Sequence, residues 1–293
     1  MLANTNLDLR LWLRAAWQMT NTKTGVSSQS LERSLGISHS TAWHLLHKLR
    51  SVMAQTSRVR LSGNVEIDET FVGGHEAGAG GRSKGKKQVV VIACESLSAT
   101  RMGRIRAARI VDASSFSLAK FISENVEDGS ALLTDGWPPY LSAVADLEAR
   151  GLDYQHKAMS LNAAEEPAHV YFPHVHRVAA LLKRWLLGTH QGSVEVHHLD
   201  QYLDEFVFRF NRRSSRNRGL VFWRLVCDLV DPGVTATTRA TIATRKSEIA
   251  TSDAQLSDAI EAWKKEHKRR VQAASRRRTK AKPPAPEPHD EPF

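Results

Sequence analysis

The apolar run from Gln88 to Cys94 constrains the fold of this chain more than any other segment. Its sequence is Gln-Val-Val-Val-Ile-Ala-Cys, and a short, almost unbroken apolar run is typical of a strand that is buried on both faces. Such a strand needs structure packed against each side, because each of its faces is apolar. The run therefore predicts the middle of a sheet that helices cover on both faces.

Strand and helix patterns follow one another along the chain in a defined order. Three strands come first, at residues 64–72, 88–94 and 104–111, and a helix follows at 114–125. Next come a short strand at 131–134, a helix after Pro139 and a strand at 154–158, and then helices at 174–187, 197–213 and 219–230. This is the element order of a ribonuclease H-like fold. The sequence therefore predicts an α/β domain with a mixed sheet flanked by helices.

The residues before the sheet predict a small helix-turn-helix domain over 1–60. Gly36 can end a first helix in a left-handed conformation, and Ser38 can cap the second helix. The second helix has an apolar face, and its polar face could enter a major groove. A plain helical hairpin is the alternative interpretation. The residues expected to contact DNA on this helix are His39, Ser40, Thr41, His44 and Lys48.

The net charge of +10 favours a polyanionic partner. Residues 264–293 hold ten Lys or Arg and four Asp or Glu, so much of that charge lies in a tail that is predicted to be disordered. A catalytic domain over 61–232 and a helical extension over 233–263 are predicted before the tail. No apolar run reaches the length of a membrane span, and no signal peptide is recognisable. We therefore expect a cytoplasmic, nucleoid-associated protein with no membrane partner.

Two acidic residues lie at alternate positions of the strand predicted at 64–72. In the segment Val65–Phe71, Glu66 and Asp68 share one face, where two carboxylates are costly unless their charge is compensated. A divalent cation would compensate it, and a solvated strand at the edge of the sheet is the alternative. Asp135 ends the strand at 131–134, and α/β sheets bind ligands at the carboxyl ends of strands. Asp68 and Asp135 could together hold two metal ions for in-line phosphoryl displacement, with Glu66 as a further ligand.

The helix that starts near Pro173 offers no carboxylate for such a site. His176 and Lys183 are seven residues apart, and therefore two turns along one helix face. His176 can bind a metal ion through a ring nitrogen and Lys183 can hold a DNA phosphate, although a histidine with a structural role is the alternative. Basic residues on the later helices predict a track for DNA phosphates, with a solvated helix end as the alternative. They are Arg184, Arg209, Arg212, Arg213 and Arg216.

Several long motifs resemble the ISXO-like insertion-sequence transposases of the DDE superfamily. The resemblance covers about residues 9–230, with the motifs in the same order along the chain. The matching segments are Met19–Val26, Val65–Gly74, Thr134–Trp137, His176 with Leu181–Gly192, and Tyr202–Arg213.

This resemblance implies an enzyme that cuts DNA strands at transposon ends and joins them to target DNA. It implies that Asp68 and Asp135 are catalytic, that His176 stands in place of the third acidic residue, and that two divalent ions, Mg²⁺ or Mn²⁺, are bound. The implied partners are double-stranded DNA and a second copy of the chain, as a homodimer in the DNA complex. Such relatives commonly carry a Cys-rich zinc ribbon before the helix-turn-helix, whereas this sequence has two widely separated cysteines.

Two other functions fit the same residues. A decayed relative could bind DNA without cutting it, which the histidine in the third position would favour. A helix-turn-helix regulator could bind a small ligand in its sheet domain, and it would not need Asp68 and Asp135.

Overall fold

The computed structural model describes residues 5–54, 59–73, 87–159, 171–191 and 195–231, together with Leu2, Gly233 and Lys265. The chain divides into two compact units, residues 1–238 and 239–293, and every element described below belongs to the first. The helical extension predicted at 233–263 and the disordered tail predicted at 264–293 lie outside the described residues, apart from two single positions.

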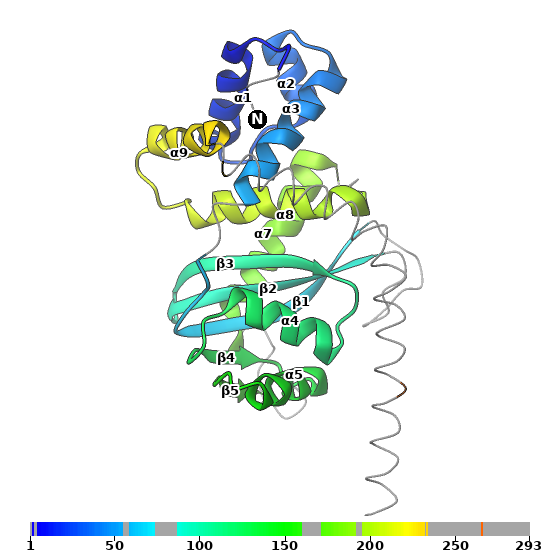
Figure 1. Cartoon of the computed structure of the whole chain (residues 1–293), viewed down its shortest axis with the longest axis vertical. Helices are drawn as coiled ribbons and strands as arrows, with labels where there is room; N and C mark the ends of the chain where they lie inside the picture. The colour runs from blue at the N-terminus through cyan, green and yellow to red at the C-terminus, as the bar shows by residue number, and fades with distance from the viewer. Residues whose placement is uncertain are drawn as a thin grey trace, which may run out of the picture. The chain divides into compact units, whose positions relative to one another are not determined.

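A five-stranded mixed sheet forms the centre of the first unit, in the order β3-β2-β1-β4-β5 (Figure 1). The first three strands form an antiparallel meander, in which β1 (Asn64–Val72) pairs with β2 (Gln88–Ser98), and β2 pairs with β3 (Arg101–Ile110). Two short parallel strands follow, β4 (Ala131–Thr134) beside β1 and β5 (Gln155–Ala158) beside β4. The prediction of a ribonuclease H-like mixed sheet is confirmed.

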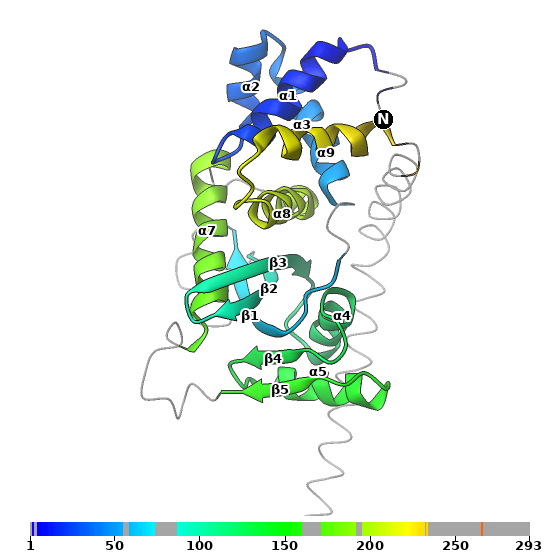
Figure 2. The same ribbon diagram turned by 90° about the vertical axis from the view of Figure 1, so that its left-hand side faces the viewer.

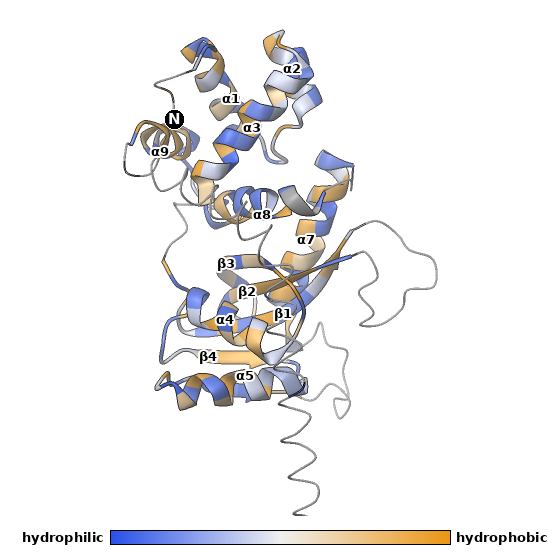
Figure 3. Cartoon of the chain, turned by 45° about the vertical axis from the view of Figure 1, so that its right-hand side comes forward, coloured by the Kyte–Doolittle hydropathy of each residue, from blue (hydrophilic) through white to orange (hydrophobic). Residues whose placement is uncertain are grey.

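The sheet is buried on both faces, as the apolar run in β2 predicts. Alternate β2 residues point to opposite sides, because successive side chains of a strand alternate. Val89 and Val91 pack with α4 (Ser115–Asn125) and α5 (Pro138–Ala149). Val90 and Ile92 pack with α7 (Pro173–His190) and α8 (Val196–Asn211) on the other face. The strand β4 is hydrophobic along its length, as expected for a strand inside the layers (Figure 3).

Four helices, together with Phe208 of α8, share a further hydrophobic core. They are α1 (Leu9–Asn21), α2 (Ser28–Leu35), α3 (His39–Met53) and α9 (Arg218–Val230). Gly36 ends α2 with a left-handed φ of 68°, and the side chain of Ser38 accepts a hydrogen bond from the backbone of Thr41 at the start of α3. The short turn between two capped helices is therefore formed as the sequence predicts.

The helix α9 departs from the arrangement that the sequence suggests. Its position in the chain groups it with the sheet domain, yet it packs against α1 and α3. The cause is a stripe of apolar residues, Val221, Leu225 and Leu229, which lie four residues apart and are buried in the core of the N-terminal helices. The helical unit is thus completed by residues far beyond position 60. None of the described helices combines the length and the apolar character that a membrane crossing requires.

The helix α8 lies between β3 on one side and α3 on the other (Figure 2). Two histidines are enclosed at this junction. The ring of His47 on α3 pairs with the amide oxygen of Gln201, and the ring of His190 lies 4.4 Å from the ring of Tyr202, centre to centre. Burial lowers the pKa of His47 to about 3 and the pKa of His190 to about 4.

These histidines predict a loss of stability in mild acid. Below a pH of about 6.5 the two imidazoles bind protons in the unfolded chain but stay neutral in the folded chain. The free energy of unfolding is therefore highest above that pH and falls as the pH drops toward 4. For His47 the loss is at most about 1.4 kcal/mol for each pH unit. Denaturant unfolding between pH 7 and pH 4.5 should show this slope, and His47→Gln should reduce it. Replacement of the exposed His39 by Gln should leave it unchanged, and an equal slope in His47→Gln would contradict the prediction.

Candidate active site

The parallel register of β1 and β4 aligns the two predicted catalytic aspartates. Asn64 pairs with Ala131, Val65 with Leu132 and Glu66 with Leu133, a constant offset of 67 positions. Asp68 and Asp135 are also 67 positions apart. Asp135, which comes directly after β4, therefore lies level with Asp68 of β1. The structure therefore places Asp68 on β1 and Asp135 directly after the neighbouring strand β4.

A turn after β4 holds Asp135. Its Oδ1 atom accepts a hydrogen bond of 3.0 Å from the backbone N–H of Trp137. Gly136 between them has a φ of 72°, a left-handed conformation that a residue with a Cβ rarely adopts. Helix α5 begins directly afterwards at Pro138, so the carboxylate is fixed between a buried strand and a helix.

Glu66 lies on the same face of β1 as Asp68 and is buried more deeply, with 2% of its surface exposed. Its Oε2 atom accepts two hydrogen bonds of 2.9 Å, from the backbone N–H groups of His174 and Val175. These donors belong to the first turn of α7, where backbone N–H groups have no partner within the helix. The negative charge also suits the positive end of the helix dipole. Glu66 therefore caps α7 and fixes the start of that helix against β1.

The capped turn brings His176 to Asp68. The His176 Nδ1 atom lies 3.6 Å from Asp68 Oδ2, and both side chains are partly exposed. Lys183 is exposed two turns further along α7. The structure thus pairs His176 with Asp68 and places Asp135 level with Asp68, directly after the neighbouring strand β4.

Tyr140 and Glu69 form a pair next to this group that the sequence did not single out. The Tyr140 hydroxyl on α5 donates to Glu69 Oε2 over 3.0 Å. Complete burial raises the pKa of Tyr140 well above its ordinary value, and the charges of Glu69, Asp68 and Asp135 raise it further. The charges of all three carboxylates therefore disfavour ionisation of this one buried hydroxyl. The signal in the sequence was the Trp137–Tyr140 segment, because a tyrosine buried after a strand end needs a partner for its hydroxyl.

The donors fit a divalent metal ion in type. Carboxylate oxygens are the ligands that Mg²⁺ prefers, and Mn²⁺ also accepts imidazole nitrogen. Within the described ranges, no three His, Cys, Asp or Glu side chains are close enough to form a metal site by themselves. Mg²⁺ is commonly held by one or two carboxylates, with waters and substrate phosphates as the other ligands. An aspartate pair open to substrate fits that pattern better than a closed protein site.

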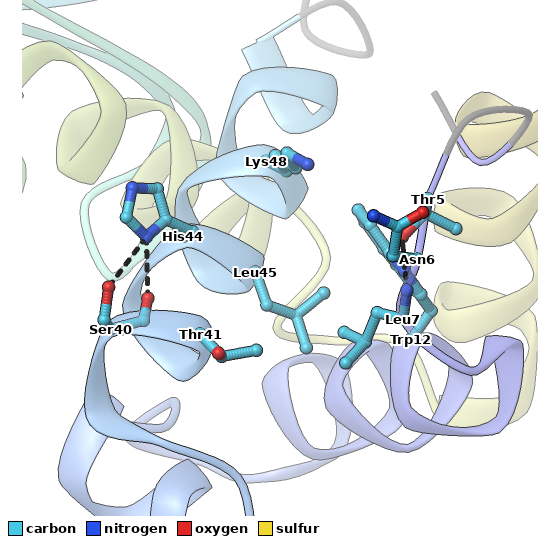
Figure 4. A pocket seen from close by; sticks show the side chains of 9 residues that line it. All are labelled: Thr5, Asn6, Leu7, Trp12, Ser40, Thr41, His44, Leu45 and Lys48. Carbon is cyan, nitrogen blue, oxygen red and sulfur yellow. Dashed lines mark hydrogen bonds between the residues drawn. The ribbon is translucent and has the colours of Figure 1, made fainter.

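Four of the five predicted DNA-contacting residues of α3 line a groove of about 350 Å³ together with residues 5–7 and Trp12 (Figure 4). Ser40, Thr41, His44 and Lys48 all border it. His44 bonds to the Ser40 backbone carbonyl, and the Lys48 ammonium lies 5.6 Å from the centre of the Trp12 ring. His39 is exposed at the start of the helix and pairs with Ser28.

The predicted phosphate track divides into two kinds of arginine. Arg184 and Arg216 are exposed. Arg209, Arg212 and Arg213 donate to backbone carbonyl oxygens within the fold. The guanidinium groups of Arg212 and Arg213 also lie over the rings of Phe208 and Phe210. These three side chains therefore have internal structural contacts, whatever their part in DNA binding.

Comparison with known proteins gives one sequence match. The profile of the ISXO2-like transposase domain matches residues 60–211, from the residue before Leu61 to the end of α8. Among curated proteins, none matches the sequence significantly.

Solved structures of retroviral proteins are similar in part. One is the catalytic core domain of BIV integrase, at 15% identity and a TM-score of 0.33, covering 56% of this chain and 95% of that one. Another is from the simian T-cell lymphotropic virus intasome in complex with PP2A regulatory subunit B56 gamma, at 15% identity and a TM-score of 0.37, covering 72% of each chain. The fold assignment itself rests on the strand order of the sheet.

The cap of α7 by Glu66 predicts a specific loss of stability. Glu66→Ala leaves two buried N–H groups without an acceptor, at about 1–3 kcal/mol for each group. Chemical unfolding should therefore show a loss of about 2–6 kcal/mol, and hydrogen exchange at His174 and Val175 should accelerate. Glu124→Ala, an exposed change on α4, should stay within about 0.5 kcal/mol of the parent chain. A Glu66→Ala chain as stable as this control would rule out the cap.

Proposed function

We propose that this chain, which belongs to the ISXO2-like transposase family, cuts DNA strands at the ends of an insertion sequence and joins them to target DNA. One observation carries the proposal. The β1–β4 register places Asp68 and Asp135 level with each other, and the capped helix α7 brings His176 to Asp68. Carboxylates in that arrangement suit two divalent ions and an in-line displacement at phosphorus.

Asp68, Asp135 and His176 are the residues proposed to hold Mg²⁺ or Mn²⁺. When bound, such ions supply charge for the attacking and leaving oxygens of the transferred phosphoryl group. Glu66 was expected as a further ligand, and its two hydrogen bonds to α7 favour a positioning role in its place. Lys183, exposed on the same helix face as His176, is proposed to hold a DNA phosphate near the site.

DNA binding is proposed for the groove beside α3 and for the exposed basic residues. Ser40, Thr41 and His44 offer hydroxyl and imidazole groups that can reach base edges in a major groove. Arg184 and Arg216 are exposed and can contact phosphates. The proposal includes a homodimer on DNA and action at the bacterial nucleoid.

A protein that binds DNA without cutting it is the second candidate. The observation in its favour is His176, because an imidazole stands where the DDE pattern has an acidic residue. The two functions differ in one measurable property, which is metal-dependent strand cleavage.

Replacement of either aspartate should abolish cleavage. Asp68→Asn and Asp135→Asn keep the shape of the side chain and remove the charge that holds the ions, so cleavage of a duplex carrying the element's ends should fall by about 10³ or more. Gel analysis of labelled strands in Mg²⁺ and in Mn²⁺ measures this loss. Asp153→Asn, an exposed change before β5, is the control and should cleave normally. Cleavage that survives in both aspartate variants would exclude this site.

Substitution of His176 should change the preferred metal. Imidazole is a poor ligand for Mg²⁺ and a better one for Mn²⁺, so the parent chain should cleave faster in Mn²⁺. His176→Glu should keep or raise cleavage in Mg²⁺, whereas His176→Ala should lose the advantage of Mn²⁺. Initial rates of strand cleavage in each metal decide the matter. An alanine variant with unchanged activity and metal preference would remove His176 from the site.

A further inference from the structure

The turn Thr22–Gly25 between α1 and α2 is held from two sides by helices of the sheet domain. Backbone carbonyl oxygens of this turn accept side-chain hydrogen bonds from both α7 and α8. Since α7 also carries His176 at its other end, one helix connects the candidate active site to the helix-turn-helix (Figure 2).

We infer that these contacts fix the helix-turn-helix at one distance from the active site, so that the chain cuts DNA at a constant number of base pairs from the sequence that α3 contacts. The inference rests on the proposed function for its DNA part. It adds a role in cut-site selection for Arg209, Trp185 and Thr189, which lie away from the reacting groups.

Helix α7 is anchored at both ends. Glu66 binds its first turn at the active site. Near its last turn, the Trp185 indole N–H donates to the Thr24 carbonyl over 2.8 Å, and the Thr189 hydroxyl donates to the same oxygen over 3.0 Å. His176 and Thr189 are thirteen residues apart, which corresponds to about 20 Å of helix, or about six base pairs of duplex DNA.

Helix α8 holds the same turn through Arg209. One guanidinium nitrogen of Arg209 donates to the carbonyl oxygens of Thr22 and Lys23, at 2.7 Å and 2.6 Å. The other terminal nitrogen lies 3.3 Å from Glu205 Oε1. A lysine could not make this set of contacts, because its single ammonium lacks the planar fork of an arginine.

Glu205 extends the connection to the proposed DNA-contacting helix. Its second oxygen accepts a hydrogen bond of 2.8 Å from Arg50 of α3, and both side chains are almost completely buried. The Arg50 guanidinium also lies over the Tyr202 ring, 4.2 Å from its centre. A buried carboxylate bound by two arginines holds one geometry, because each charge would be left unpaired if the helices moved apart.

The close approach of Arg209 depends on Gly25. This glycine has a φ of 76°, and a Cβ there would lie 2.3 Å from the Arg209 guanidinium and 2.9 Å from Glu205 Oε1. Any other residue would therefore be strained and would displace the arginine. The turn, the arginine and the glutamate form one fitted contact between the helical unit and the sheet domain.

Mapping the cut position on an end-labelled duplex at nucleotide resolution tests the inference. The parent chain should cut at one phosphate. Trp185→Phe, and separately Thr189→Val, should spread the cuts over neighbouring phosphates while total cutting stays of the same order, because each removes a hydrogen bond to the Thr24 carbonyl. Tyr154→Phe is the matched control, because the Tyr154 hydroxyl makes the same kind of carbonyl contact with Val126 and does not touch the turn. A single unchanged cut position in both Trp185→Phe and Thr189→Val would overturn the inference.

A distance measurement separates this inference from the proposed function. Spin labels at exposed Arg33 of α2 and Glu148 of α5, in a full chain with Cys94 and Cys227 replaced by alanine, report the separation of the two domains without DNA. A narrow distance distribution that broadens in Arg209→Gln supports the fixed connection, and equal widths overturn it. If the parent chain cuts no DNA in either metal, the proposed function fails, and the distance measurement still decides whether the connection exists.

Discussion

Backbone hydrogen bonds between β1 and β4 set the geometry on which the candidate site depends. Because the strands are parallel and pair from Asn64 with Ala131, the two aspartates lie level at the end of the pair. A shift of one residue in this register would turn alternate side chains to the opposite face. Val65 and Leu132 would then leave the buried core, so the hydrophobic packing of the sheet maintains the register and, with it, the spacing of the carboxylates.

Two buried glutamates connect the sheet to α7, and α8 to the N-terminal helices. Glu66 binds the start of α7 and places His176 beside Asp68, while Glu205 holds Arg50 and Arg209 where α8 meets the N-terminal helices. Buried carboxylates are costly without partners, and each of these has two strong donors. The free-energy cost of burying these carboxylates is offset only when the helices and strands that carry the donors are in this relative position. The charged contacts therefore help to fix how the elements are arranged.

The hydrophobic patterns predicted most of the fold, because strand and helix periods depend on local sequence. The sheet and its flanking helices follow from such patterns and from element order, whereas the level positions of Asp68 and Asp135 come from the β1–β4 register. The pattern also placed Glu66 on the face of Asp68, but it could not show that the first turn of α7 takes up that carboxylate. Likewise, Arg209 was predicted from its charge alone, and only the folded chain reveals the carbonyls that it binds. Long-range partners are set by tertiary packing, which a local pattern does not contain.

The central claim is that Asp68 and Asp135 share one metal-binding site at the end of the β1–β4 pair. Anomalous diffraction from crystals of the full chain grown with Mn²⁺ and a short DNA duplex tests it most directly. The account predicts Mn²⁺ within bonding distance of carboxylate oxygens from both aspartates, with His176 in contact with the site. Aspartate carboxylates more than about 8 Å apart, or Mn²⁺ bound to only one of them, would contradict it, because the two ions of such a site lie about 4 Å apart.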